Sequence, residues 1–154
     1  MTQPRPRKFA TALALVAASV GTLAVAASPA DTIAARQANF KKMGGAMKVI
    51  KDQLAGGADK AKMADAAKTI AAVARAQIPM FPKGTGPGAG VKTDALPAIW
   101  TDRATFDGHA KKLIVEADKL VAATGTGNAA AIGAQFKAVG GTCGACHKQF
   151  RADD

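Results

Sequence analysis

The amino-acid sequence predicts an all-α fold: an antiparallel, up-down-up-down four-helix bundle with one long Gly/Pro-rich loop between the second and third helices. Three observations support this prediction. Apolar residues recur at intervals of three and four from residue 31 onward, no long stretch alternates with a period of two, and aromatic residues make up only 5% of an alanine-rich chain. Small side chains let helices approach closely, whereas strands favour β-branched and aromatic residues.

Residues 1–26 have the pattern of a secretory signal peptide. Three basic residues (Arg5, Arg7 and Lys8) precede an uncharged, mostly apolar run over residues 9–26, which ends with the small residues Ala24 and Ala26. The run is just long enough to span a bilayer, so a membrane anchor is the alternative. Its alanine-rich composition and its cleavage-like end favour removal after Ala26. We therefore expect Sec export to the periplasm and one folded domain over residues 27–154.

The first helix of the bundle is predicted to run from residue 31 to the glycine pair at 56–57, because glycine commonly ends helices. Successive steps of four and three residues place one stripe of side chains on a single helical face. The stripe consists of Arg36, Phe40, Met43, Met47, Ile50 and Leu54.

The second helix is predicted to begin after Asp59, whose carboxylate can cap it, and to stop at Pro79. Residues 79–97 then contain most of the helix breakers of the chain. We predict a crossover loop there and not a linker between domains, because neither side could bury a core alone. The stripe of the second helix consists of Met63, Ala66, Ile70, Val73 and Gln77.

Helical spacing resumes for two further helices. The third ends at Gly125 and Gly127, and the fourth begins near Asn128. Isolated helices of this length are marginal in water, so packing of the apolar stripes must stabilise them. The third stripe consists of Phe106, Ala110, Leu113, Ala117, Leu120 and Thr124, and the fourth of Ile132, Phe136, Val139, Cys143, Cys146, His147 and Phe150.

The net charge of the chain favours an acidic partner surface. The predicted leader contains three of the 21 basic residues and none of the 11 acidic ones, so about +7 of the total +10 stays on the mature chain. Nucleic acid is not an expected partner, because no cluster of Lys and Arg interleaves with aromatic residues, Tyr is absent, and export removes the chain from the genome.

Residues 143–147, Cys-Gly-Ala-Cys-His, form the most specific motif of the chain. Two thiols separated by two residues can add to the two vinyl groups of one haem, and the adjacent histidine can reach the iron from the same side. The motif therefore predicts one covalent haem c, attached through two thioethers at Cys143 and Cys146. His147 is then the metal ligand, and the cytochrome c maturation machinery is an expected partner.

Three other chemistries use closely spaced cysteines. A disulfide between Cys143 and Cys146 would close a strained four-residue loop within a helix. A thiol redox pair would be expected at a helix start within a βαβ unit, which this sequence lacks. A zinc site would lack ligands, because His109 is the only other histidine and no second CxxC is present. Haem attachment is the favoured interpretation.

The motif and its surroundings resemble the class II c-type cytochromes, the cytochrome c′ family. The pentamer lies near the C-terminus and is followed by Lys148, Gln149, Phe150 and Arg151. Arg36-Gln37 with Phe40 is similar to the first helix of the family, and Phe81 with Pro97-Ala98-Ile99-Trp100 is similar to its crossover loop. Cytochrome c′ is a known up-down-up-down bundle, so the fold expectation rests partly on this resemblance.

The resemblance implies roles for residues beyond the motif. Arg36 and Gln37 would lie beside the haem propionates, and a guanidinium has the fork geometry and the permanent charge to bind a carboxylate. The alternative for Arg36 is an ordinary solvated position. Arg151 would lie near the imidazole of His147, although a surface cation at a helix C-terminus is an equally plain interpretation.

The position of Phe40 implies the state of the iron. Members of the family with an apolar residue there are high-spin, and members with a methionine there are low-spin. Phe40 therefore implies a five-coordinate iron with a crowded distal side that binds nitric oxide (NO) or carbon monoxide (CO). The alternative is a low-spin His/Met electron carrier in which Met43 or Met47 is the sixth ligand, although most such methionines fill cores.

Gas binding and electron transfer are thus the two functional hypotheses, and an enzyme is not expected. Peroxidase chemistry would need a distal acid/base pair, and His109 is expected to be solvated between Asp107 and Lys111. Family members often form dimers through their first two helices, so the resemblance allows a homodimer.

Overall fold

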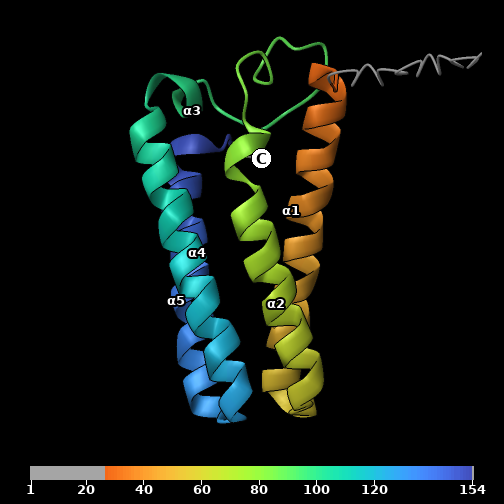
Figure 1. The fold of residues 1–154 in the computed structure, drawn as a ribbon, viewed down its shortest axis with the longest axis vertical. Helices are drawn as coiled ribbons and strands as arrows, with labels where there is room; N and C mark the ends of the chain where they lie inside the picture. Colours follow the sequence, from red (N-terminus) through yellow and green to blue (C-terminus); the bar gives the residue numbers. More distant parts are fainter. Residues whose placement is uncertain (1–26, 154) are drawn as a thin grey trace, which may run out of the picture.

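The computed structural model describes residues 27–153, and the predicted leader with its cleavage site lies outside them. Four long helices run alternately up and down: α1 (Pro29–Asp52), α2 (Lys60–Ala76), α4 (Arg103–Thr126) and α5 (Ala129–Phe150) (Figure 1). The predicted four-helix bundle is confirmed. Within the described part of the chain, no helix combines the length and the apolar character needed to cross a membrane.

Side-chain caps define where the helices begin. Asp59 accepts a hydrogen bond from the Lys62 amide at 3.0 Å, and Asn128 accepts one from the Ala131 amide at 3.0 Å, so α2 and α5 start where the sequence predicts. Helix α1 begins two residues earlier than predicted. Ser28 and Asp31 form a reciprocal capping box there, and Pro29 is suited to the first turn.

The end of the first helix differs in detail from the prediction. Helix α1 passes into a π-helical turn, η1 (Gln53–Gly57), which reaches the predicted glycine pair. The residue that adopts the left-handed conformation is Ala58, with φ of 47°. The Gln53 side chain accepts a hydrogen bond from the Asp59 amide at 3.0 Å and thereby joins the turn to the cap of α2.

The crossover loop lies between a short 3₁₀ turn, η2 (Ile78–Met80), and a short helix, α3 (Ala98–Thr101). The indole of Trp100 donates to the carbonyls of Phe81 and Pro82 at 3.2 and 2.9 Å. Trp100 also packs so closely on Gly86 that a Cβ there would lie 2.8 Å from its ring. The loop is therefore anchored to the bundle.

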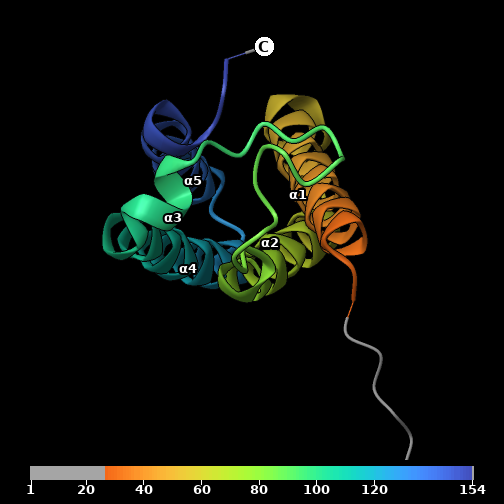
Figure 2. The same cartoon turned by 90° about the horizontal axis from the view of Figure 1, so that it is seen from above.

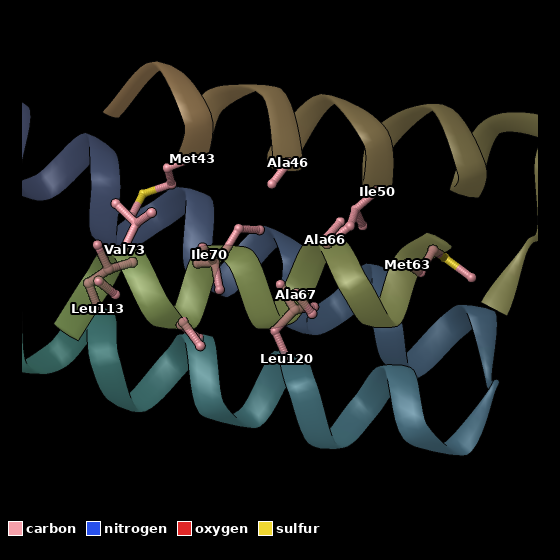
Figure 3. Packing of buried hydrophobic residues seen from close by; sticks show 14 of the residues in the cluster. Met43, Ala46, Ile50, Met63, Ala66, Ala67, Ile70, Val73, Leu113 and Leu120 are labelled. Atoms are coloured by element: carbon pink, nitrogen blue, oxygen red, sulfur yellow. The ribbon is translucent and has the colours of Figure 1, made fainter. Parts of the chain in front are cut away.

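The helices contact one another in the order α1, α2, α4, α5, as the view from above shows (Figure 2). Helices α1 and α5 form no comparable contact with each other, and α2 lies diagonally across from α5. The main apolar core extends from the end of the bundle away from the loop to Ala74 near the end of α2, and Met43, Ala46 and Ile50 of α1 pack within it (Figure 3). A second apolar cluster lies at the loop end and contains Phe81, Ile99, Phe106 and Phe150.

Candidate functional site

A cavity of about 490 Å³ occupies the loop end of the bundle. Its walls come from the middle of α1, the end of α2, the crossover loop with α3, the first half of α4 and the end of α5. Because α1 and α5 do not pack on each other, the bundle leaves room for a ligand between them. Most of the lining is apolar, which is typical of small-molecule and cofactor sites.

The α5 wall of the cavity contains the two cysteines and the histidine of the predicted attachment motif. Cys143, Cys146 and His147 all line the cavity, because positions three and four apart share one helical face. Both thiols are free and half-buried. Thr142, just before the motif, is buried, and its hydroxyl donates to the Val139 carbonyl at 2.7 Å.

The surroundings of the two thiols disfavour a thiol redox pair and a zinc site. Burial raises the pKa of Cys143, and burial together with the neighbouring Cys143 raises the pKa of Cys146 to about 11. Thiols that act as redox nucleophiles have lowered pKa values. The part of the chain that the structure describes also contains no group of three or more His, Cys, Asp or Glu residues that could hold a metal ion alone.

His147 is suited to donate a lone pair. Partial burial, followed by the nearby charge of Arg151, lowers its pKa below the ordinary value. The lowered pKa favours the neutral imidazole, which is the form that ligates metals. Arg151 lines the same cavity and forms an ion pair of 3.6 Å with Asp94 of the loop, so it couples the end of α5 to the loop.

The α1 wall contains Phe40, Met43 and Met47. Phe40 and Met47 are half-buried, whereas Met43 is buried within the main core. All three residues that the sequence singled out for the distal side thus border the space beside the attachment motif. Phe40 also begins a chain of ring contacts that runs through Phe81 and Phe106 to Phe150 on α5.

Arg36 is not a solvated residue. Its side chain is 2% exposed, lines the cavity, and lies 4.4 Å from the ring centre of Phe81. Its guanidinium donates to the Met80 carbonyl, to both the hydroxyl and the carbonyl of Thr85, and to the hydroxyl of Thr93, at 2.9 to 3.2 Å. These acceptors are all uncharged. Burial lowers the pKa of Arg36, but a guanidinium stays protonated.

Gln37 lies at the mouth of the cavity. It is exposed, and its amide donates to the Lys92 carbonyl of the loop at 3.0 Å. Arg36 and Gln37 therefore organise the crossover loop as well as bordering the cavity, a role that the sequence did not predict.

Two further residues line the cavity without having been predicted to do so. His109 was expected to be solvated, but it is half-buried with its ring edge-on to Phe150 at 5.9 Å. It lies three residues after Phe106 and therefore shares the apolar face of α4. Gln77 was placed on the stripe of the second helix. It is buried, and its Nε2 atom has no hydrogen-bond partner. In the sequence, only its polar side chain at the end of an apolar stripe marked Gln77 as a candidate cavity residue.

Comparison with known proteins shows similarity in both sequence and fold. A profile of the family described as Cytochrome C′ matches residues 31–151. The chain is 41% identical over 145 residues to cytochrome c′ from Rhodospirillum rubrum, covering 91% of this chain and 95% of that protein.

Two solved structures are also similar. One is a cytochrome c′ described as having an unusual ligand-controlled dimer dissociation, with a TM-score of 0.80 and 31% identity over 84% of this chain and 100% of that one. The other is the nitric oxide complex of a variant of cytochrome c prime from Alcaligenes xylosoxidans, with a TM-score of 0.74 and 27% identity over 82% and 98% of the two chains.

Proposed function

The chain belongs to the cytochrome c′ family, and from this premise we propose that it is a periplasmic cytochrome that binds NO or CO at a five-coordinate haem iron. The family carries covalently attached haem c. The observation that supports gas binding most directly is Phe40, a side chain without a lone pair, on the wall that borders the attachment motif. A solved relative described as a nitric oxide complex supports the same proposal.

The residues present fit a haem. Two thiols and a neutral imidazole lie on one wall of the cavity, and apolar and aromatic side chains make up most of the rest. Arg36 adds a buried positive charge whose acceptors in the structure are all neutral. A buried charge without a counter-charge is costly, and a propionate would supply one. We therefore assign Cys143 and Cys146 to the thioethers and His147 to the iron.

Each residue then has a defined task. The haem supplies a redox-active iron that can bind small gases. His147 provides one neutral nitrogen ligand, and the cation of Arg151 nearby makes the site more positive and reduction easier. Phe40 lies on the α1 wall of the cavity, where its side chain would crowd the iron and exclude bulky ligands. Arg36 and Gln37 hold the loop that closes the cavity and lie where they can bind propionates.

Electron transfer is the second candidate function, and positive charges around the cavity support it. Lys41 and Arg151 line the cavity and are exposed. A cationic rim attracts an acidic redox partner in a salt-dependent way. We propose no enzymatic activity, and peroxide turnover faster than that of free haem would contradict this proposal.

Absorption spectra of the purified protein, before and after adding CO, test the proposed function. We expect a broad ferrous Soret band without a sharp α-peak and a strong change on adding CO. A sharp low-spin ferrous spectrum that CO does not alter would show that Met43 or Met47 closes the site, and electron transfer would then be the function.

Replacing Phe40 by alanine is expected to strengthen CO binding roughly tenfold or more, because relief of overpacking releases on the order of 1–3 kcal/mol. Flash photolysis and equilibrium titration of the ferrous protein measure the effect. The matched control is Phe136→Ala on α5, which removes a half-buried ring that packs against the main core and does not line the cavity. Equal CO affinity in wild type and Phe40→Ala would show that Phe40 does not restrict access to the iron.

We also propose cleavage after Ala26 and export to the periplasm. The described helix α1 supports this boundary, because its capping box begins at Ser28, two residues after the proposed cut. The mass of the haem-loaded protein from the periplasmic fraction is expected to correspond to a chain that starts at Ala27. A mature chain that retains residues 1–26 would instead indicate a membrane anchor.

We also propose that the protein self-associates. A solved relative is described as a dimer with ligand-controlled dissociation. The large apolar residues that are exposed in the described region are Val49, Val91 and Val115, which lie on α1, the loop and α4 and form no single patch. Light scattering with and without CO measures the oligomeric state.

A further inference from the structure

The cavity contains a buried hydrogen-bond donor that the described protein does not satisfy. Gln77 caps the end of α2, is 6% exposed, and lines the cavity. Among residues 27–153, its Nε2 is the single buried side-chain nitrogen or oxygen without a hydrogen-bond partner. Buried donors are satisfied in the great majority of cases, and an exception calls for an explanation such as a ligand.

The neighbouring polar side chains of the cavity already have hydrogen-bond partners within the protein. The guanidinium of Arg36 donates to Met80, Thr85 and Thr93, and the amide of Gln37 donates to Lys92. The amide of Gln77 is therefore the buried donor that remains available to an occupant of the cavity.

The place of Gln77 in the fold indicates which side of the occupant it meets. The attachment motif with His147 lies on α5, and α2 lies diagonally across the bundle from α5 (Figure 2). A side chain from the end of α2 therefore enters the cavity from the side away from His147. That is the side on which a ligand of the iron would be held.

We propose that Gln77 is a specificity-determining residue: its side-chain amide donates a hydrogen bond to a small uncharged ligand held on the side of the iron opposite His147. This inference rests on the proposed function. A propionate is expected to bind the charged guanidinium of Arg36, because a buried carboxylate needs a charged partner, and it therefore does not require the neutral amide of Gln77. A neutral diatomic does not need a charged partner. The cavity thus selects for diatomic ligands that can accept a hydrogen bond over those that cannot.

The test compares wild type with Gln77→Leu, using CO as the probe and its ¹³C isotopologue to identify the C–O stretching band. Leucine has a similar volume and lacks the donor. We expect the C–O stretching frequency to rise in Gln77→Leu and CO to dissociate about three- to tenfold faster, which corresponds to one neutral hydrogen bond. Gln77→Met provides a second variant without a donor if the leucine variant folds poorly.

The matched control is Gln135→Leu. The amide of Gln135 already donates to the backbone and side chain of Glu116, and it does not line the cavity. This variant is expected to leave both the C–O band and the CO dissociation rate unchanged. Thermal melts of all four proteins verify that the comparison is made between folded, haem-loaded samples.

Three results would overturn the inference, and they are distinguishable. If wild type and both Gln77 variants share one C–O band and one dissociation rate, Gln77 does not contact the ligand. If the band is unchanged but the reduction potential and the melting temperature fall, Gln77 binds a propionate instead. If ferrous wild type does not respond to CO at all, the proposed function falls together with this inference.

Discussion

The double variant Cys143→Ala, Cys146→Ala is expected to contain no covalent haem and to show no cooperative thermal transition. The reason is the size of the space that the haem would leave. Loss of the haem would leave an apolar space of about 490 Å³ at the loop end, and water that entered it would contact the apolar walls of the bundle. A small domain has a free energy of unfolding of only about 5–15 kcal/mol, so the loss of this packing is expected to remove most of it. Circular dichroism with thermal melting measures the loss, and the absorbance of denatured protein reports covalent haem.

Two related variants separate attachment from ligation. Cys146→Ala retains one thioether position and is expected to keep some covalent haem and an intermediate melting temperature. His147→Ala is expected to keep the haem covalently bound while its spectrum changes, because only the iron ligand is lost. A double cysteine variant that melts cooperatively without haem would show that the apolar stripes alone complete the core.

The dependence on haem follows from how the helices pack. Helices α1 and α5 do not contact each other as the other neighbouring helices do, so at the loop end the space between them belongs to the cavity. At the loop end, ring contacts from Phe40 through Phe81 and Phe106 to Phe150 surround the cavity and do not fill it. A large apolar cofactor would join the two halves of the bundle.

Local sequence patterns were sufficient to predict the four long helices. The spacing of three and four residues depends only on helical geometry, and caps such as Asp59 and Asn128 act within three residues of their own position. The CxxCH motif is equally local, because its three functional residues lie within five positions of one helix. For the same reason the sequence could place the thiols and His147 on one face.

The interactions that shape the cavity could not be predicted in this way. Arg36 reaches acceptors 44 to 57 residues away in the chain, and no local spacing reveals such partners. The stripe of the second helix located Gln77 on the inner face but did not show that its amide lacks a partner. The polar neighbours of His109 in sequence predicted that its side chain would be solvated. Its position three residues after Phe106 instead places it on the apolar face of α4, where it is half-buried.

Replacing Arg36 by leucine is expected to lower the free energy of unfolding of the haem-loaded protein by about 3–5 kcal/mol, because buried carbonyls lose their donor and the propionate assigned to Arg36 would lose its cation. Arg36 is 2% exposed, and its guanidinium donates hydrogen bonds to Met80, Thr85 and Thr93. Without it, the carbonyls of Met80 and Thr85 lose a charged donor, and the Thr85 hydroxyl keeps its bond to the Pro82 carbonyl at 2.8 Å. Chemical denaturation of the haem-loaded protein measures the change.

Arg36→Lys distinguishes charge from geometry. Lysine keeps the positive charge but cannot reproduce the planar guanidinium that donates to Met80, Thr85 and Thr93 at once. We therefore expect Arg36→Lys to be more stable than Arg36→Leu and less stable than wild type. Amide hydrogen exchange adds a local readout, because residues 80–93 should exchange faster in both variants if Arg36 holds the crossover loop in place.

The matched control for Arg36 is Arg75→Leu on α2. Arg75 is an exposed arginine that pairs with Asp118, and surface ion pairs contribute at most about 1 kcal/mol. If Arg36→Leu cost no more than Arg75→Leu, and exchange in residues 80–93 were unchanged, the buried guanidinium would not stabilise the loop. The proposed contact with a propionate would fail as well, because a buried carboxylate that lost its cation would destabilise the haem-loaded protein.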